Sequence, residues 1–282
     1  MEFIIQRIHR TDIECNDCNN PKDPDDVTIQ NLDYNEELGK TKLEHYADFI
    51  NYPYQFIYEL TEAEAGVLID AIPRGYTYSV VDENYHSELD TIVQRLKCSS
   101  IPPMPEHGWF VRMSSCSPKD GKYYTYQFMS IEQIIEQFAT SRRILLSLLK
   151  GDRKVYFVPF DPTWDTSCEL RVFVCNGKVT CISQYVFTKY SVFSVMNDDQ
   201  LKRMGYGIKN FVENKLKDIL PQLGTMNVVC DIYWVDDEQF KIIELNSFGY
   251  WLAAGSALFH WQNDRDKLYG HDPNKFYFRV YK

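Results

Sequence analysis

Two carboxylates and an amide stand inside stretches of sequence that otherwise look suited to burial. The acidic segment at residues 236–239 separates two apolar runs and reads as the turn of a β-hairpin. Asp231 lies in the first run, and Glu244 and Asn246 lie in the second. With a four-residue turn, Asp231 would face Glu244 across the hairpin, with the two Cβ atoms about 5 Å apart. Because side chains alternate along a strand, Asn246 would leave the same face as Glu244.

Such a cluster would present oxygen ligands, which suit a Mg²⁺ ion held partly by protein and partly by phosphate oxygens. Opposed like charges destabilise a sheet unless something offsets them, so the metal-free protein should lose no stability when Asp231 is removed. The alternative is structural: Asp231 caps a loop, and Glu244 forms an ordinary ion pair with Arg171 or Lys154. The residue types leave both interpretations open.

Expected strands in the second half of the chain would position this cluster. Residues 168–175 and 178–184 flank Asn176-Gly177, the strongest short signal for a type I′ turn and hence for a hairpin. A shorter strand is expected at 154–158, where prolines follow. A long helix is expected over residues 198–220, because apolar residues recur there every three or four positions.

The first half combines short expected helices with a strand and a polar loop. Helical spacing of apolar residues predicts helices near residues 43–50, 61–71 and 87–97. A strand at 109–113 leads into a polar loop at 114–121, and a further helix starts after Ser130. The order of strand, polar loop and helix is typical of a loop that binds a ligand.

The composition is that of an ordinary globular protein. The chain has 282 residues, of which 44% are hydrophobic, enough for one large or two modest domains. The net charge of −10 repels phosphate backbones, so we expect no extended nucleic-acid surface. No apolar run approaches the roughly 20 residues of a membrane span, and the start lacks a secretory signal. We therefore expect no membrane association and a cytoplasmic location.

The eight cysteines are scattered through the chain, which favours reduced thiols over a disulfide framework. Cys15 and Cys18 have the spacing of half a zinc site, but the next cysteine is Cys98, so we do not interpret the pair as a metal site. The pair lies in a segment rich in Asp, Asn and Pro, at about residues 13–37, which we expect to be a mobile loop.

Six short pieces of the sequence, taken in order, resemble the cell division cycle protein 123 family. They are FVRMSSCSPKD (110–120), ELRVFV (169–174), ISQ (182–184), DIY (231–233), ELNSFG (244–249) and LFHW (258–261). The resemblance covers about residues 52–261. It implies an α+β, ATP-grasp-like fold, in which ATP lies between two α+β subdomains. It also implies a role in assembling the three-subunit translation initiation factor two, through binding of its gamma subunit.

The resemblance also suggests how the chain divides. Residues 1–40 would form an N-terminal segment with the mobile loop. Residues 41–153 would form the N-terminal ATP-grasp-like subdomain, and residues 154–282 the C-terminal one, with an antiparallel sheet and the metal site.

Several residues receive roles from the resemblance. Arg112 stands where the family has a lysine that reaches the phosphates, and its planar cation can also grip phosphate oxygens. Ser117, Lys119 and Asp120 resemble a flexible flap over the phosphates. The backbone of Tyr156, Phe157 and Val158 would pair with the adenine edge. The alternatives without a binding role are a surface arginine at 112, a solvated lysine at 119 and an apolar edge strand at 156–158.

The remaining roles lie further along the chain. Glu169, Arg171 and Gln184 would complete the ATP contacts, with Arg171 on the phosphates. Asp231, Glu244 and Asn246 match the positions that bind magnesium, so the resemblance favours the metal over the ion pair.

Some positions depart from the family pattern. Glu244 stands where many members have aspartate, and Ser247 replaces a usual proline. Residues 250–256 are longer and more apolar than the expected loop. Trp251 and its neighbours could form a lever between nucleotide and protein partner, or could pack into the core.

Three functions therefore come into consideration. The first is an ATP- and Mg²⁺-dependent assembly factor, and the second is an ATP-grasp ligase that activates a carboxylate through a phosphorylated intermediate. The third is a binding module that has lost ATP. The complete set of oxygen ligands argues against the third, and the resemblance favours the first.

Overall fold

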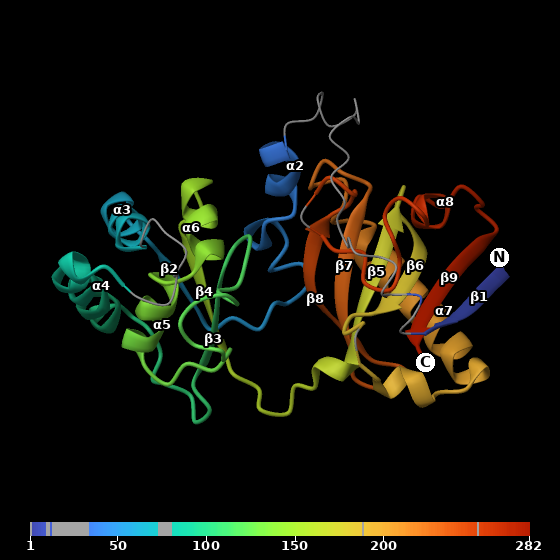
Figure 1. The fold of residues 1–282 in the computed structure, drawn as a ribbon, viewed down its shortest axis with the longest axis horizontal. Helices are drawn as coiled ribbons and strands as arrows, with labels where there is room; N and C mark the ends of the chain where they lie inside the picture. Colours follow the sequence, from blue (N-terminus) through green and yellow to red (C-terminus); the bar gives the residue numbers. More distant parts are fainter. Residues whose placement is uncertain (1, 10–11, 13–33, 73–80, 188, 253) are drawn as a thin grey trace. The chain divides into compact units, whose positions relative to one another are not determined.

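The computed structural model describes residues 2–9, 12, 34–72, 81–187, 189–252 and 254–282, and it divides into two compact units (Figure 1). The larger unit combines Met1–Asn51 with Asp165–Lys282, and the smaller unit is Tyr52–Trp164. The smaller unit is thus inserted between two segments of the larger one. Cys15, Cys18 and most of the predicted mobile loop lie outside the described residues.

The smaller unit packs helices against a three-stranded antiparallel sheet. The helices are α3 (Glu62–Ala71), α4 (His86–Cys98), α5 (Ile131–Phe138) and α6 (Arg142–Leu149), and the 3-10 turn η3 (Glu83–Tyr85) precedes α4. The strand order is β2 (Phe56–Glu59), β4 (Lys154–Pro159) and β3 (Trp109–Met113). Apolar side chains from one face of the sheet and from these helices form one buried cluster.

Side-chain caps explain where these helices begin. Thr61 and Glu64 form the predicted capping box at α3. The Ser130 side chain accepts a hydrogen bond from a backbone amide at the start of α5, and Ser141 does the same for α6. The predicted helices at 61–71 and 87–97 and the helix after Ser130 are confirmed, whereas α6 was not predicted.

The larger unit is built on a six-stranded sheet with the strand order β1, β9, β6, β5, β7, β8. These strands are β1 (Glu2–Ile8), β5 (Glu169–Cys175), β6 (Lys178–Gln184), β7 (Val228–Trp234), β8 (Phe240–Ser247) and β9 (Lys275–Tyr281). Strand β9 runs parallel to β1 and β6, and the other pairs are antiparallel. The short elements are α2 (Tyr34–Lys40), η2 (Leu43–His45), η4 (Thr166–Cys168), η5 (Val192–Val195) and α8 (Arg265–Leu268).

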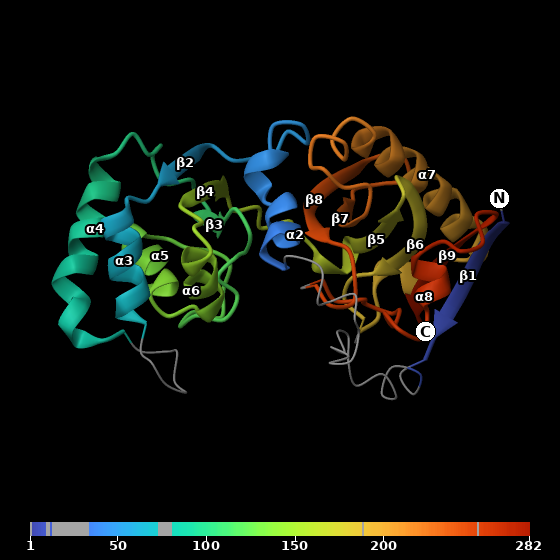
Figure 2. The same ribbon diagram turned by 90° about the horizontal axis from the view of Figure 1, so that it is seen from above.

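Two elements of the larger unit were predicted from the sequence, a hairpin within the sheet and a long helix. Asn176 and Gly177 have φ values of 52° and 71°, the left-handed conformation of a type I′ turn, so the predicted β5–β6 hairpin is confirmed. The predicted long helix is α7 (Asp198–Leu216), which ends before the predicted residue 220. Figure 2 shows α7 and α8 on opposite faces of the sheet. The α8 face carries a second buried cluster, which includes Phe173 and Trp261.

Three predictions about chain division and local structure need correction. Strand β4 is the central strand of the small sheet, so residues 154–159 do not open the C-terminal subdomain. Residues 1–51 belong to the larger unit, where β1 extends the sheet and the Tyr46 hydroxyl accepts a hydrogen bond from the Leu245 amide of β8. The predicted helix at 43–50 is only the turn η2. Pairing between distant segments decides the chain division, and local sequence patterns do not encode it.

Within the described part of the chain, no helix has both the length and the apolar character that spanning a bilayer requires.

Candidate functional site

Asp231 and Glu244 are cross-strand partners on β7 and β8, as predicted. The hairpin loop is one residue longer than predicted, because Trp234 rather than Val235 pairs with Phe240. A bulge next to Asp231 shifts the register back by one residue. The two departures cancel, so the predicted opposition of the carboxylates is correct although both local features were missed.

The side-chain amide of Asn246 joins the two carboxylates. Its Nδ2 donates to Asp231 Oδ2 at 3.1 Å and to Glu244 Oε1 at 3.4 Å. Asp231 is 2% exposed, whereas Glu244 and Asn246 are half-buried. The three predicted metal-ligating side chains therefore converge, and the amide nitrogen marks a point within reach of both carboxylates.

Arg171 is the cation that offsets these negative charges. It opposes Asp231 across β5 and β7, and its Nε and Nη2 donate to the two Asp231 oxygens, each at 2.8 Å. Its Nη1 donates to the Gly255 carbonyl at 2.6 Å. The structural alternative paired Arg171 with Glu244, and the partner is corrected here to Asp231. The register of β5 against β7 decides the partner.

The surroundings of Arg171 keep it charged. Burial alone lowers the pKa of its guanidinium, but the charge and hydrogen bonds of Asp231 outweigh burial, and the pKa is raised above its ordinary value. The Tyr185 ring lies 4.9 Å from the guanidinium carbon, within the range of a cation–π contact. Arg171 and Asp231 thus form a buried ion pair at the site.

Gln184, a predicted ATP contact, is engaged inside the larger unit. Its side chain is fully buried. The side-chain amide bonds to the carbonyls of Val186 and Lys189, the Ser191 hydroxyl and the Tyr281 amide. It therefore fixes the chain after β6 rather than reaching outward. Glu169, the other predicted contact on this hairpin, opposes Tyr233 of β7 and is half-buried.

In the smaller unit, the predicted nucleotide contacts on the sheet are more buried than expected. Arg112 is 4% exposed and its Nε donates to the Met113 carbonyl at 3.2 Å, so the alternative of a surface arginine is wrong. Tyr156 and Phe157 pair with strands on both sides, which corrects the edge-strand alternative. Their backbone N–H and C=O groups are used in pairing with the neighbouring strands. The predicted adenine contact therefore rests mainly on Val158.

The polar loop after β3 is anchored. Ser117 is 6% exposed, whereas Lys119 is exposed. The Asp120 carboxylate accepts hydrogen bonds from the Ser141 hydroxyl at 2.5 Å and from the Arg143 amide at 3.2 Å. The loop is therefore tied through Asp120 to the start of α6. The role of the loop as a flap over the phosphates stays a prediction.

A sequence model of the D123 family matches residues 162–282, which carry the whole Arg171, Asp231, Glu244 and Asn246 cluster. These residues, the D123 region of the chain, are similar in sequence to the D123 family. The match supports the predicted resemblance to the cell division cycle protein 123 family.

Two solved structures share the fold over a larger part of the chain. C-terminally truncated Cdc123 from Schizosaccharomyces pombe is 14% identical, with a TM-score of 0.61 and coverage of 88% of this chain and 98% of that chain. Another structure of Cdc123 from the same organism is 14% identical, with a TM-score of 0.61 and coverage of 87% and 97%. The chain thus has the fold of these Cdc123 structures, and the predicted α+β class is confirmed.

Other comparisons add less. A D-alanine–D-alanine ligase from Bacillus anthracis complexed with ATP has a TM-score of only 0.38 and 12% identity, covering 84% of this chain and 64% of that chain. No curated protein sequence matches the chain.

Ser247, a departure from the family pattern, has a structural role in the D123 region. Its Oγ donates to the Glu37 carbonyl at 3.1 Å and lies 3.1 Å from Thr41 Oγ1. These contacts tie α2 to β8, the edge strand that carries Glu244 and Asn246. Proline, which has no hydroxyl, could not make them.

The apolar segment of the D123 region after Asn246 packs inward. Tyr250 and Leu252 are 5% and 1% exposed, and Trp251 packs against the buried cluster on the α8 face. The Tyr250 hydroxyl and the Trp251 indole N–H are buried without hydrogen-bond partners among the described residues. The structure thus supports packing into the core rather than an exposed lever.

The donors of the D123 region fit Mg²⁺ in chemical type. No group of three or more His, Cys, Asp and Glu side chains that could hold a metal occurs in the described part of the chain, since the third member here is an amide. A half-turn of the Asn246 amide would present its oxygen where the nitrogen now lies. Asp231 could then keep its bonds to Arg171, because each carboxylate oxygen has two lone pairs. The set would then offer three oxygen donors to a hard cation.

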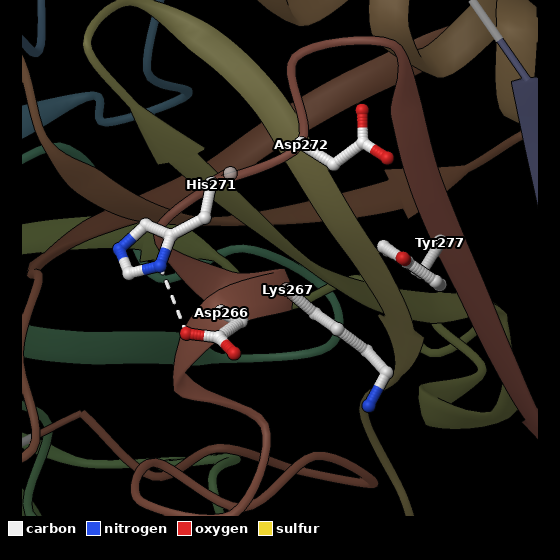
Figure 3. Close-up of a pocket in the computed structure, with 6 residues that line it drawn as sticks. Asp266, Lys267, His271, Asp272 and Tyr277 are labelled. Carbon is white, nitrogen blue, oxygen red and sulfur yellow. Dashed lines mark ion pairs between the residues drawn. The ribbon is translucent and has the colours of Figure 1, made fainter.

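A separate surface pocket of about 300 Å³ lies beside the start of β9 (Figure 3). It is lined by Asp266, Lys267, Gly270, His271, Asp272 and Tyr277. His271 Nδ1 lies 2.8 Å from Asp266 Oδ1, and both side chains are exposed. None of the predicted site residues lines this pocket.

Proposed function

We propose that this protein binds ATP together with Mg²⁺ and acts as an assembly factor for translation initiation factor two, through the gamma subunit of that factor. The observation that carries the proposal is the convergence of Asp231, Glu244 and Asn246 beside Arg171 within a D123 family region. The partner rests on the resemblance to the cell division cycle protein 123 family. A translation factor as partner places the proposed role in the cytoplasm.

Each residue of the cluster has a distinct proposed part. Asp231, Glu244 and the amide oxygen of Asn246 would hold Mg²⁺, which when bound supplies positive charge against phosphate oxygens. Arg171 holds the Asp231 carboxylate in position through two charge-assisted hydrogen bonds. In the metal-free protein, the amide nitrogen of Asn246 takes the place of a cation between the carboxylates.

The smaller unit would supply further cations for the phosphates, from Arg112 and Lys119. Arg112 is nearly buried and held by a backbone carbonyl, so it would act from a fixed position. Lys119 is exposed on an anchored loop. Val158 remains the proposed backbone contact for the adenine edge.

Calorimetric titration with ATP tests the nucleotide site. We expect saturable binding in the presence of Mg²⁺ and much weaker binding after EDTA removes the metal. Asp237→Asn is a matched control, because it removes an exposed carboxylate from the same hairpin. Equal ATP affinity with and without Mg²⁺ would contradict a role of the metal in ATP binding.

Capture of the purified gamma subunit, with and without ATP and Mg²⁺, tests the partner. Binding that ATP strengthens supports the assembly role. If the gamma subunit is not captured, while ATP is hydrolysed when a small carboxylate is added, the ligase function replaces the assembly role.

A further inference from the structure

One buried side chain of α5, Gln137, holds the polar loop that follows β3. Gln137 is 0% exposed. Its Nε2 donates to the Pro118 carbonyl at 2.5 Å and to the Tyr123 carbonyl at 3.3 Å. Its Oε1 accepts from the Tyr123 amide at 2.7 Å. A single amide thus binds the loop at two points, on either side of residues 119–122.

Gly121 shows how closely the loop approaches this glutamine. A Cβ atom at residue 121 would lie 2.7 Å from Gln137 Cδ and 2.7 Å from the Gln137 carbonyl oxygen. The second of these atoms belongs to the backbone of α5, so it cannot move aside easily. The close contact therefore requires glycine, and the loop conformation depends on the pairing of Gly121 with Gln137.

The main chain at Lys119 is fixed from both sides. Gln137 holds the carbonyl of Pro118, and the carboxylate of Asp120 is held at the start of α6. The Lys119 amide itself donates to the Ser117 carbonyl at 2.9 Å. The Lys119 side chain is nevertheless exposed. The loop thus presents an ammonium group from an ordered backbone.

We propose that Gln137 is a positioning residue for nucleotide binding. It holds the loop in an ordered conformation before ATP binds, so that Lys119 can contact the ATP phosphates without a further ordering of the loop. This inference rests on the proposed function for its ligand. Ordering a loop on binding costs conformational entropy, and a loop that is already ordered avoids most of this cost. The hydrogen bonds of Gln137 to the loop should therefore raise the affinity for ATP, although Gln137 itself does not touch the nucleotide.

The test compares Gln137→Ala with Gln133→Ala in the full chain. Gln133 lies on the same helix and its side chain accepts a hydrogen bond from the Met129 amide at 2.8 Å, so it is a matched control. We expect the Kd for ATP with Mg²⁺ to rise about tenfold in Gln137→Ala and to stay unchanged in Gln133→Ala. Hydrogen exchange at the Tyr123 amide of the nucleotide-free protein should become faster in Gln137→Ala alone.

A double-mutant cycle with Lys119→Met separates positioning from general stability. If Gln137 acts through Lys119, Gln137→Ala should cost less than about twofold in affinity once Lys119 is replaced. An equal loss in both backgrounds overturns the inference, as does a lower melting temperature with unchanged ATP affinity. If Gln137→Ala does not fold, Gln137→Glu keeps the volume and the acceptor for Tyr123 but loses the donor to Pro118, and the same loss is expected.

The outcomes also separate this inference from the proposed function. ATP binding by the unmodified protein, with unchanged affinity in Gln137→Ala, counts against the role of Gln137 alone. No ATP binding by the unmodified protein overturns the proposed function and the nucleotide role of Gln137 together.

Discussion

Arg171 and Asp231 form a buried bidentate ion pair across β5 and β7, with both hydrogen bonds at 2.8 Å. The pair lies beside Glu244, which opposes Asp231 on the other flanking strand. Asp231, a proposed metal ligand, therefore also has a structural role. Removing either partner would leave an uncompensated charge in a buried site, which is strongly destabilising.

Asp231→Ala is expected to lower the free energy of unfolding by about 3–5 kcal/mol, because Arg171 would stay charged and buried without its partner. This reverses the expectation from the sequence that losing one of two opposed carboxylates costs no stability. Urea denaturation in EDTA measures the effect. The double variant Arg171→Met, Asp231→Leu should recover most of the loss, and a single variant as stable as the unmodified protein would contradict the prediction.

Glu244→Gln should separate metal binding from folding. Glu244 is half-buried and opposes another carboxylate, so its neutralisation should raise the stability of the metal-free protein by up to about 0.5 kcal/mol. The Mg²⁺ dependence of ATP binding should be lost at the same time. Melting temperature in EDTA and calorimetry with ATP give the two readouts, and a retained Mg²⁺ dependence would exclude Glu244 as a ligand.

Acid stability should depend on a second buried ion pair, between Asp264 and Arg279. Burial raises the pKa of the Asp264 carboxyl, but hydrogen bonds and charge from Arg279, with help from Lys267, outweigh burial and hold the pKa below its ordinary value. Since the folded-state pKa is depressed, its stabilisation is present above the unfolded pKa of about 4 and is lost as the pH falls through the folded-state value.

Asp264→Asn should therefore flatten the fall in stability below about pH 4, and it should lower stability at neutral pH. Urea denaturation at a series of acidic pH values checks this. An acid profile identical to that of the unmodified protein would show that this pair does not control it.

Trp251→Ser is expected to lower the free energy of unfolding by about 1–3 kcal/mol, because the ring packs against the buried cluster on the α8 face. Tyr124→Ser is the control, since Tyr124 is fully exposed and should change stability by less than about 0.5 kcal/mol. Thermal melting compares the two. An unchanged melting temperature in Trp251→Ser would favour the alternative in which Trp251 forms a lever between nucleotide and protein partner.

Local signals carry the parts of the fold that were predicted correctly. Asn176-Gly177 specifies a turn by its own backbone preference, and the Thr61 capping box specifies a helix start. The partner of Arg171 and the central place of β4 depend on pairing between segments far apart in the chain. No local pattern encodes such pairing. Gln137 had a weak signal, a glutamine beside the apolar stripe of α5, but only the structure shows which loop it holds.

The pairing of β1 with β9 has a consequence for synthesis. In the sheet, β1 adjoins β9 alone, and β9 is the last of the six strands in chain order. Residues 2–8 therefore leave the ribosome long before residues 275–281, and they find their neighbour only when those residues emerge. Until then β1 exposes unpaired backbone, which invites pairing with foreign strands. A nascent chain that stalls before β9 would thus leave β1 without its neighbouring strand.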